Sequence, residues 1–460
     1  MLTYRQYTEV ANAPFLLMLS NAMRETRDVQ LYVTGEYAFC CVTGRQLPKS
    51  AELRGNLSRG EMLALCEQKH FEYSVYGQEV LIIHNDRRYM YGALVKGNTA
   101  DDAKAHDFTI NSIYISVQDG EAEDPLDALS DINNSVLRCP DDPHKLFSQK
   151  TAAMLHMVRI ACEYDFSVDD DMLSAAKNNA YRLANLSGDT VRNALSAILM
   201  SDTARAYEGR DVKGDRSPVL RGLLMLRNMD AFAYMIPELE AGRGVEQKKR
   251  YHMHDVQGHM LHTCAETPPR LYMRFAGLLH DIGKPEAHRQ NEGKNMHGHD
   301  RIGAMMARNI LQRLHCKDEF ISKVCRIIAI HMYDVAGIAK PETLRKRFAL
   351  WGYRLTQDLI DFRFADVAGS GCPERKSDSA LRFREVFEQM QAENAPFSIY
   401  ELRIAGREIA DIMGLHSGAE INEVKRDMLR MCAVTPSLNE RNTLARIALE
   451  MKNGADIAEN

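Results

Sequence analysis

The chain has 460 residues, 45% of them hydrophobic, which is more than one small core can organise and predicts several packed domains. Its 58 basic and 63 acidic residues give a formal net charge of -5, so the composition excludes a strongly basic nucleic-acid-binding protein, and any RNA contact should use a local patch. The ten cysteines include no CxxC pair and no apolar run reaches the roughly 20 residues of a membrane-spanning helix, so we expect a cytoplasmic protein with reduced thiols and no membrane partner.

The first third of the chain combines strand and helix patterns. Short apolar runs at residues 29–33 and 79–83 are typical of strands, so residues 1–140 are expected to form a small α/β domain. From about Phe147 onward, apolar residues recur at helical spacing. This spacing predicts helices almost to the end of the chain.

Three breaks divide the helical part of the chain. They lie at residues 140–143, 242–250 and 369–375, where glycine, proline and charged residues interrupt the apolar spacing. The expected fold is therefore multi-domain and mainly α. Its parts are the α/β head at 1–140, an all-helical neck at 141–245, a central helical domain at 246–372 and a helical tail at 373–460.

The central domain contains a His280-Asp281 pair at the end of an apolar helical run. One such pair is a weak signal, because a histidine beside an acid is commonly a structural pair. Ligand-type residues also occupy helical segments before and after it, namely His259, His299, His331 and Asp366. Imidazole and carboxylate together suit Mn, Fe, Co, Ni or Zn, and an aspartate can bridge two ions, so we expect one or two divalent metals here. The alternative is a packed polar core without metal.

A metal centre of this composition predicts phosphoester hydrolysis. A divalent ion lowers the pKa of bound water to about 7 and offsets the negative charge of a phosphoryl group. The expected catalytic residues are His280, Asp281 and Lys284, with Lys284 close enough to contact a substrate phosphate. The order H…HD…H…H…D resembles the HD phosphohydrolase superfamily. That resemblance implies action on phosphomonoesters and 2′,3′-cyclic phosphates.

Segments outside this site resemble the class II tRNA nucleotidyltransferase and poly(A) polymerase family, known for CCA-adding enzymes. DFTINSIYISVQDGEAEDPLDALSDINNSVLR at 107–138 is similar to the ribose-reading motif and hinge, MVRIACEYDFSVDDDM at 157–172 to the neck, and residues 398–444 to the tRNA-gripping tail. The resemblance implies a nucleotidyltransferase-like head, with a phosphorylated nucleotide and RNA, either a tRNA or an RNA 3′ end, as partners. The nucleotide- or RNA-binding residues that it implies are Gly35, Asp107, Asn111 and Arg159.

The head departs from that family where nucleotidyl transfer takes place. Where the family has a glycine pair, an Arg-Asp and an Asp-x-Asp doublet, this chain has Thr34-Gly35, Ala38-Phe39 and Ser50-Ala51-Glu52. Two-metal transfer needs several carboxylates fixed around Mg ions, so we do not expect Mg-dependent transfer in the head. The arginine pair before Asp107 is replaced by Ala105-His106.

The base-selecting motif is also altered, because Gln149-Lys150 and Ala153 replace its Glu-Asp and Arg. Three hypotheses follow. The first is a family paralogue whose HD site hydrolyses a nucleotide, an RNA 3′ end or a cyclic phosphate. The second is an active CCA-adding or poly(A)-adding transferase in which Glu36, Asp101 or Asp102 compensates for the lost carboxylates. The third is a catalytically dead RNA-binding pseudoenzyme.

Overall fold

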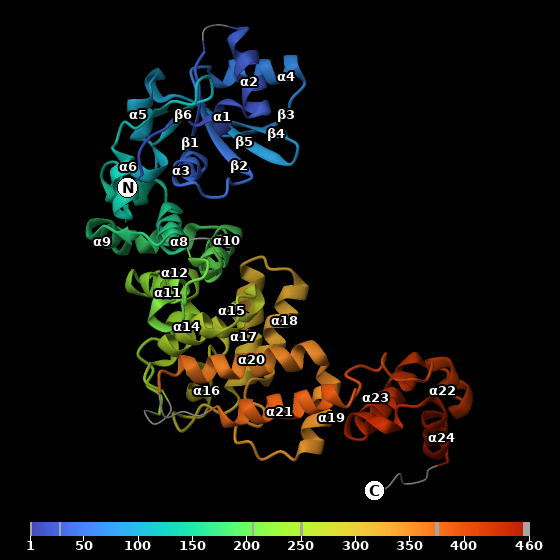
Figure 1. Ribbon diagram of the computed structural model, residues 1–460. Coiled ribbons are helices and arrows are strands. Elements are labelled where there is room, and N and C mark those ends of the chain that lie inside the picture. Colours follow the sequence, from blue (N-terminus) through green and yellow to red (C-terminus); the bar gives the residue numbers. More distant parts are fainter. Residues whose placement is uncertain (1, 27–28, 205–206, 249–251, 373–376, 454–460) are drawn as a thin grey trace. The chain divides into compact units, whose positions relative to one another are not determined.

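The computed structural model describes residues 2–26, 29–204, 207–248, 252–372 and 377–453. It has the expected architecture, a small α/β head followed by helices (Figure 1). The chain forms two compact units, Met1–Val212 with Arg221–Met235, and Lys213–Leu220 with Ile236–Asn460. The finer division into four domains stays a prediction. Within the described ranges, no helix combines the length and the apolar character that a membrane span requires.

The head is built on a mixed sheet, with strand order β3-β4-β5-β2-β1-β6-β7 in the described residues. Strands β2 and β5 are parallel, and the other neighbouring pairs are antiparallel. Both runs predicted as strands belong to it, although the first strand begins two residues later than expected, at Leu31. The strands are β1 (Leu31–Thr34), β2 (Ser50–Gly55), β3 (Glu72–Tyr76), β4 (Glu79–His84), β5 (Arg87–Ala93), β6 (Tyr114–Ser116) and β7 (Ala122–Glu123).

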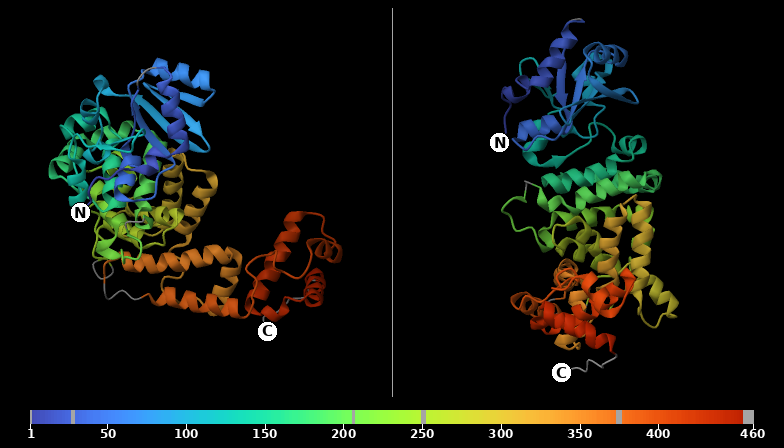
Figure 2. Two further views of the ribbon diagram at one scale, coloured as in Figure 1. Left: turned by 45° about the horizontal axis from the view of Figure 1, so that its top comes forward. Right: turned by 90° about the vertical axis from the view of Figure 1, so that its right-hand side faces the viewer.

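Helices lie against this sheet, as both views of Figure 2 show in blue. In one of them Phe15 stacks on His84 with ring centroids 4.4 Å apart and also contacts Tyr89 at 4.5 Å, which joins the helix to β4 and β5. Another begins at a capping box, in which Ser58 and Glu61 bond each other's backbone amides. The helices are α1 (Thr8–Ala11), α2 (Pro14–Arg24), α3 (Gly35–Thr43), α4 (Arg59–Lys69), α5 (Thr99–Ala103) and α6 (Ala128–Asn134).

The rest of the first unit is helical with one exception. Two-residue strands β8 (Val136–Leu137) and β9 (Ser167–Val168) pair in parallel, so the expected all-helical neck contains a strand that joins it to the end of the head. Asp169 caps the helix after β9, as acidic residues commonly do at a helix start. The helices are α7 (Pro143–Gln149), α8 (Ala153–Tyr164), α9 (Asp170–Asn179), α10 (Gly188–Leu199), α11 (Pro218–Asn228) and α12 (Phe232–Met235).

The second unit is all-helical in its described residues. Its helices are α13 (Pro237–Glu240), α14 (Val256–Glu266), α15 (Leu271–Leu279), α16 (Lys284–Gln290), α17 (His299–Arg313), α18 (Asp318–Ile330), α19 (Pro341–Trp351), α20 (Tyr353–Gly369), α21 (Asp378–Ala392), α22 (Gly406–Met413), α23 (Gly418–Val434) and α24 (Arg441–Lys452).

Glycines allow the helices around the central domain to approach closely. A Cβ at Gly283 would lie 2.5 Å from the amide nitrogen of Gly303, so only glycine lets the turn after α15 rest on α17. A Cβ at Gly369 would lie 2.5 Å from the Cα of Thr263, where α20 meets α14. Main-chain contact therefore sets the spacing between the turn after α15 and α17, and between α14 and α20.

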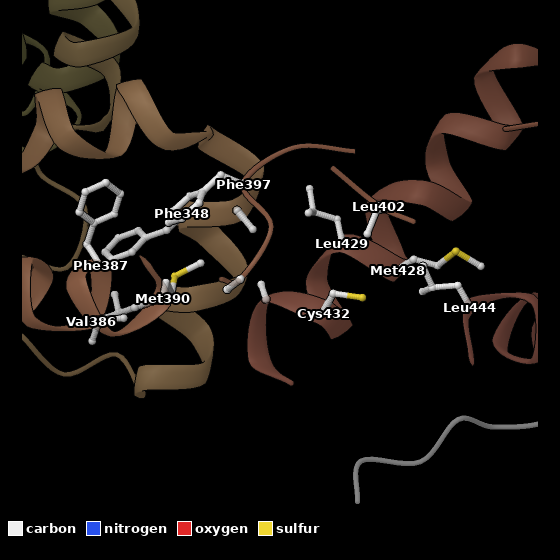
Figure 3. Packing of buried hydrophobic residues seen from close by; sticks show 14 of the residues in the cluster. Phe348, Val386, Phe387, Met390, Phe397, Leu402, Met428, Leu429, Cys432 and Leu444 are labelled. Carbon is white, nitrogen blue, oxygen red and sulfur yellow. The ribbon is translucent and has the colours of Figure 1, made fainter. Parts of the chain in front are cut away.

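A separate apolar cluster joins α19, α20 and α21 to the C-terminal helices. Figure 3 shows Phe348, Phe387 and Met390 on one side of it and Met428 and Leu444 on the other.

Loss of volume in this cluster should destabilise the second unit. Leu444 is fully buried, and Leu444→Ala should lower the free energy of unfolding by about 2 to 5 kcal/mol. The chain's single tryptophan, Trp351, packs against the same cluster, so its fluorescence in urea follows the transition. Leu449 lies on the same helix but is 50% exposed, and Leu449→Ala should cost well under about 1 kcal/mol. Equal losses in the two variants would contradict the assignment of this core.

In the head, β2, β6 and α5 contribute to one cluster of polar side chains. Asp102 accepts a 2.7 Å hydrogen bond from the Tyr114 hydroxyl, and its carboxylate lies 3.5 Å from Arg54 and 3.8 Å from Nε2 of His106. The His106 side chain is only 8% exposed. Burial, together with the positive charge of Arg54, lowers the pKa of His106 to about 4. The folded head therefore holds this histidine neutral.

Lowering the pH should destabilise the head, because the unfolded chain takes up a proton at His106 more readily than the folded head does. An unfolded chain binds a proton at His106 below about pH 6.5, whereas the folded head does so only near pH 4, so stability falls as the pH is lowered between these values. The loss should reach up to about 3 kcal/mol, and His106→Asn should remove it. Thermal unfolding at pH 7, 5.5 and 4.5 measures the effect, with exposed His144→Asn as the control. A wild type and His106→Asn that lose stability in parallel would refute this prediction.

Candidate metal centre and the head cavity

The carboxylate of Asp281 is the centre of the predicted metal site. It lies in the turn between α15 and α16 and is 2% exposed. Its Oδ2 is 3.1 Å from Nε2 of His280 and 3.5 Å from Nε2 of His259, and its Oδ1 is 3.2 Å from Nε2 of His299 and 3.7 Å from Nε2 of His331. Each carboxylate oxygen therefore faces its own pair of imidazoles.

The second predicted aspartate joins one of these pairs. Asp366, on α20, has its Oδ1 2.9 Å from Nε2 of His259 and 3.6 Å from Nε2 of His280. The six residues predicted from sequence thus come together from five segments of the chain. They form two groups of donor atoms that could each hold an ion, His259 with His280 and Asp281, and Asp281 with His299 and His331.

Backbone carbonyls fix the orientation of all four imidazoles. Nδ1 of each ring donates to a carbonyl oxygen, which leaves the lone pair of Nε2 facing Asp281. The distances are 3.2 Å from His259 to Gly369, 2.9 Å from His280 to Gly277, 2.8 Å from His299 to Met296 and 2.6 Å from His331 to Ile328.

When the rings are neutral, this orientation places acceptor atoms against each other. The Nε2 atoms of His259 and His280 are 3.2 Å apart, and those of His299 and His331 are 3.3 Å apart. Neutral imidazoles that donate through Nδ1 have only lone pairs to offer between them. A cation between each pair and the carboxylate would relieve that repulsion, so the donor set fits divalent metals.

The electrostatics of the site lead to the same conclusion. Burial lowers the pKa of His259 and of His331. Burial also opposes a charge on His280, but the Asp281 and Asp366 carboxylates raise its pKa to about 9. The pKa of Asp281 is held well below its usual range against burial, chiefly by His280 and Lys284. His280 and Lys284 provide the positive charge beside this carboxylate, and a bound divalent metal would also provide it.

Lys284 supplies part of that charge. It lies at the start of α16, and its Nζ is 2.5 Å from Oδ2 of Asp281 and donates to the Gln247 side chain at 2.6 Å. The Lys284 side chain is 12% exposed and the Asp366 side chain 20% exposed, whereas the four histidines are almost completely buried. The site therefore opens toward Lys284 and Asp366.

Sequence reasoning did not find Gln247 as the partner of Lys284. Its only sequence signal was a polar residue in a charged stretch before α14, and Lys249 and Arg250 of that stretch lie outside the described residues. The remaining nearby histidines are not part of the donor set. His254 stacks on His262 with centroids 3.9 Å apart, and His252 packs edge-on against His259.

The head contains a cavity of about 460 Å³, and its lining includes residues that the family resemblance assigns to the transfer site. Asp107 and Asn111 line it, as does Glu52 of the altered doublet. Among the described lining residues, the permanent charges are five carboxylates and two cations, namely Glu36, Glu52, Glu79, Asp102 and Asp107 against Arg54 and Lys150.

Basic side chains of the chain itself neutralise two of these carboxylates. Arg159 donates to both oxygens of Glu36 at 3.2 Å, and the Tyr164 hydroxyl donates to the same carboxylate at 2.5 Å. Lys150 donates to Asp107 at 2.8 Å. Burial would raise the pKa of Asp107, but hydrogen bonds from His156 and Lys150 lower it to about 2. The arginine and the aspartate implied as nucleotide contacts are therefore engaged within the protein.

The head residues do not fit a pair of Mg ions. Ser50 carries no charge, and Glu52 lies so close to Gly35 that a Cβ there would meet its Cδ at 2.7 Å. Gly35, with φ of +66°, thus makes room for this carboxylate. The suggested compensating residues do not restore the pair, because Asp102 bonds Tyr114 and Asp101 bonds the Asn98 side chain away from the cavity lining.

Comparison with known proteins agrees with this two-site architecture. Residues 43–138 match the poly(A) polymerase head domain, and residues 251–367 match the HD domain. The A-adding tRNA nucleotidyltransferase of Deinococcus radiodurans is 26% identical over 361 residues, which cover 75% of this chain and 77% of that protein.

Solved structures share the fold along nearly the whole chain. The CCA-adding enzyme of Bacillus stearothermophilus in complex with CTP aligns with a TM-score of 0.63 and 16% identity, over 98% of this chain and 99% of that one. The CCA-adding enzyme of Thermotoga maritima with tRNA aligns with a TM-score of 0.59 and 13% identity, over 98% and 100%. With its poly(A) polymerase head domain, its HD domain and these relatives, the chain fits the class II tRNA nucleotidyltransferase family.

Proposed function

We propose that the site around Asp281 is a metal-dependent phosphohydrolase centre of the HD type. The observation that supports this most is that both oxygens of one buried carboxylate face separate histidine pairs. His259, His280 and Asp366 would hold one ion at Oδ2, and His299 and His331 would hold a second at Oδ1. Imidazole and carboxylate donors favour Mn, Fe, Co, Ni or Zn.

The chemistry follows from the charges around the carboxylate. Divalent ions bound there would lower the pKa of water and offset the negative charge of a phosphoryl group. Asp281 would hold both ions, and the buried histidines would keep bulk water away from the closed side. Lys284, at the open side, would bind a phosphate oxygen of the substrate by a charge-assisted hydrogen bond.

We infer that the substrate is a phosphorylated nucleotide or an RNA 3′ end, including a 2′,3′-cyclic phosphate. This inference rests on the scaffold. The Bacillus stearothermophilus relative was solved with CTP and the Thermotoga maritima relative with tRNA, and this chain shares their fold over 98% of its length. A tRNA is the RNA partner that this fold supports best.

Loss of Asp281 should remove both ions. We expect Asp281→Asn to bind no Mn²⁺ and His299→Ala to retain the ion at Oδ2 alone. Hydrolysis of bis(p-nitrophenyl) phosphate and of 2′,3′-cyclic AMP with Mn²⁺, Co²⁺ or Ni²⁺ should fall about 100-fold or more in Asp281→Asn, since loss of even an outer partner of a metal ligand costs about 10- to 100-fold. Metal analysis and initial rates measure both effects.

The matched control for these variants is His288→Ala. His288 lies on α16, close in sequence to the site, but is exposed and outside the donor set. It should retain both ions and full turnover. Equal metal content and equal rates in wild type and Asp281→Asn would exclude the hydrolase proposal.

A second candidate function is nucleotidyl transfer in the head. It is favoured by the match to an A-adding enzyme and by the cavity, which keeps Asp107 and Asn111 in its lining. The ion pairs of Glu36 with Arg159 and of Asp107 with Lys150 argue against it, because nucleotide phosphates and Mg ions would have to displace them.

The transfer candidate is tested by incorporation of labelled ATP or CTP into tRNA that lacks its 3′-terminal nucleotides. We expect no incorporation with Mg²⁺ or Mn²⁺, because Glu52 is the one carboxylate left at the doublet and cannot hold two ions. The Deinococcus radiodurans enzyme serves as the positive control. Incorporation that disappears in Glu52→Gln would establish that the head is an active transferase.

A further inference from the structure

A buried arginine on α20 holds the segment that carries one of the four histidines. Arg363 lies one helical turn before Asp366 and is 4% exposed. Its guanidinium donates to the carbonyl oxygens of His331 and Asp334 at 3.4 Å each, and also to that of Tyr333. It therefore contacts the main chain on which His331 stands.

That main chain needs such support because α18 ends at Ile330. His331 follows the helix, and the hydrogen bond from its Nδ1 to the Ile328 carbonyl connects it to α18 but not to α20. The segment after it turns away, with Asp334 at a positive φ of 49°. Arg363 donates to the carbonyls of His331 and Tyr333, which follow the helix, and joins the Gly337 amide, 3.0 Å away, at the carbonyl of Asp334.

The surroundings of Arg363 keep the guanidinium in one orientation. Its Cζ lies 4.3 Å from the centroid of the Phe383 ring on α21, and a planar fork stacked on a ring is held more firmly than a lysine would be. Burial lowers the pKa of Arg363 to about 10, opposed chiefly by the carboxylate of Asp366. The charge is thus taken out of water and compensated by the carboxylate of the metal site.

We propose that Arg363 is a positioning residue that fixes His331, and with it the second ion position at Oδ1 of Asp281, relative to Asp366. This inference rests on the proposed metal centre. Because Arg363 and Asp366 share one turn of α20, a single helix holds a donor of the first ion position directly and a donor of the second through Arg363. The planar fork holds its donors in fixed directions toward these carbonyls, which the rotatable ammonium of a lysine does not.

A second arginine, which binds the same connection between α18 and α19, provides a matched control. Arg382, on α21, donates to the carbonyl oxygens of Gly337 and Ala339, several residues beyond His331, and its guanidinium lies 3.7 Å from the Asp334 carboxylate. It supports the far half of the connection between α18 and α19 and contacts none of the six donor residues. Arg382→Met removes a clamp of similar kind without touching the main chain of His331.

The test is Mn²⁺ binding to the full chain, measured by calorimetry and by the electron paramagnetic resonance signal of a coupled ion pair. Wild type and Arg382→Met should each bind two ions and give the coupled signal. In Arg363→Met the second ion should bind about 10- to 100-fold more weakly, with loss of that signal, while the first ion binds normally. Arg363→Lys should also lose the second ion, and this variant replaces Arg363→Met in the test if Arg363→Met does not fold.

The outcomes separate this inference from the proposal on which it rests. A wild type that binds no Mn²⁺ would remove the metal centre itself. Two ions of unchanged affinity in Arg363→Met or in Arg363→Lys would overturn the positioning role alone. Equal weakening of the second ion in Arg382→Met would also overturn it, because support of the connection in general would then be the cause.

Discussion

The burial of one carboxylate determines the arrangement of the central helices. Asp281 is withdrawn from water, and an uncompensated charge there would be very costly. Its two oxygens must therefore be met by positive charge. His280 and Lys284 lie beside them, and α14, α17 and the end of α18 bring further imidazoles. Backbone carbonyls behind the four imidazoles orient their Nε2 atoms toward Asp281. The positions of the helix ends and the geometry of the site therefore depend on each other.

The head balances its charge in a different manner. There the carboxylates of Glu36 and Asp107 meet Arg159 and Lys150 from the same chain, and the cavity needs no outside cation for them. The donors of the central site converge on one carboxylate, whereas in the head basic side chains of the chain itself meet Glu36 and Asp107. The poly(A) polymerase head domain and the HD domain of this chain thus balance their carboxylates in different ways.

Sequence reasoning predicted the α/β head and the helical remainder, and it singled out the six residues that lie together around Asp281, because the order of histidines and aspartates along helical segments is readable without coordinates. That these residues bind metal stays a prediction. Sequence reasoning could not predict which oxygen of Asp281 each histidine faces, since that depends on helix crossing. The Glu36–Arg159 pair joins residues 123 positions apart, so no local sequence pattern predicts it. The strand at Ser167–Val168 was missed because two residues give no measurable alternation.

The glycine contacts at Gly283 and Gly369 have a consequence for how this site can change over evolutionary time. Where helices touch through side chains, repacking can widen or narrow the gap by small steps. Here backbone touches backbone at glycine, so no smaller side chain can narrow the gap, and one added methyl group at either position would force the two main chains apart. A lineage that needed a different ion would have to exchange the ligating side chains themselves, within a frame that stays the same size.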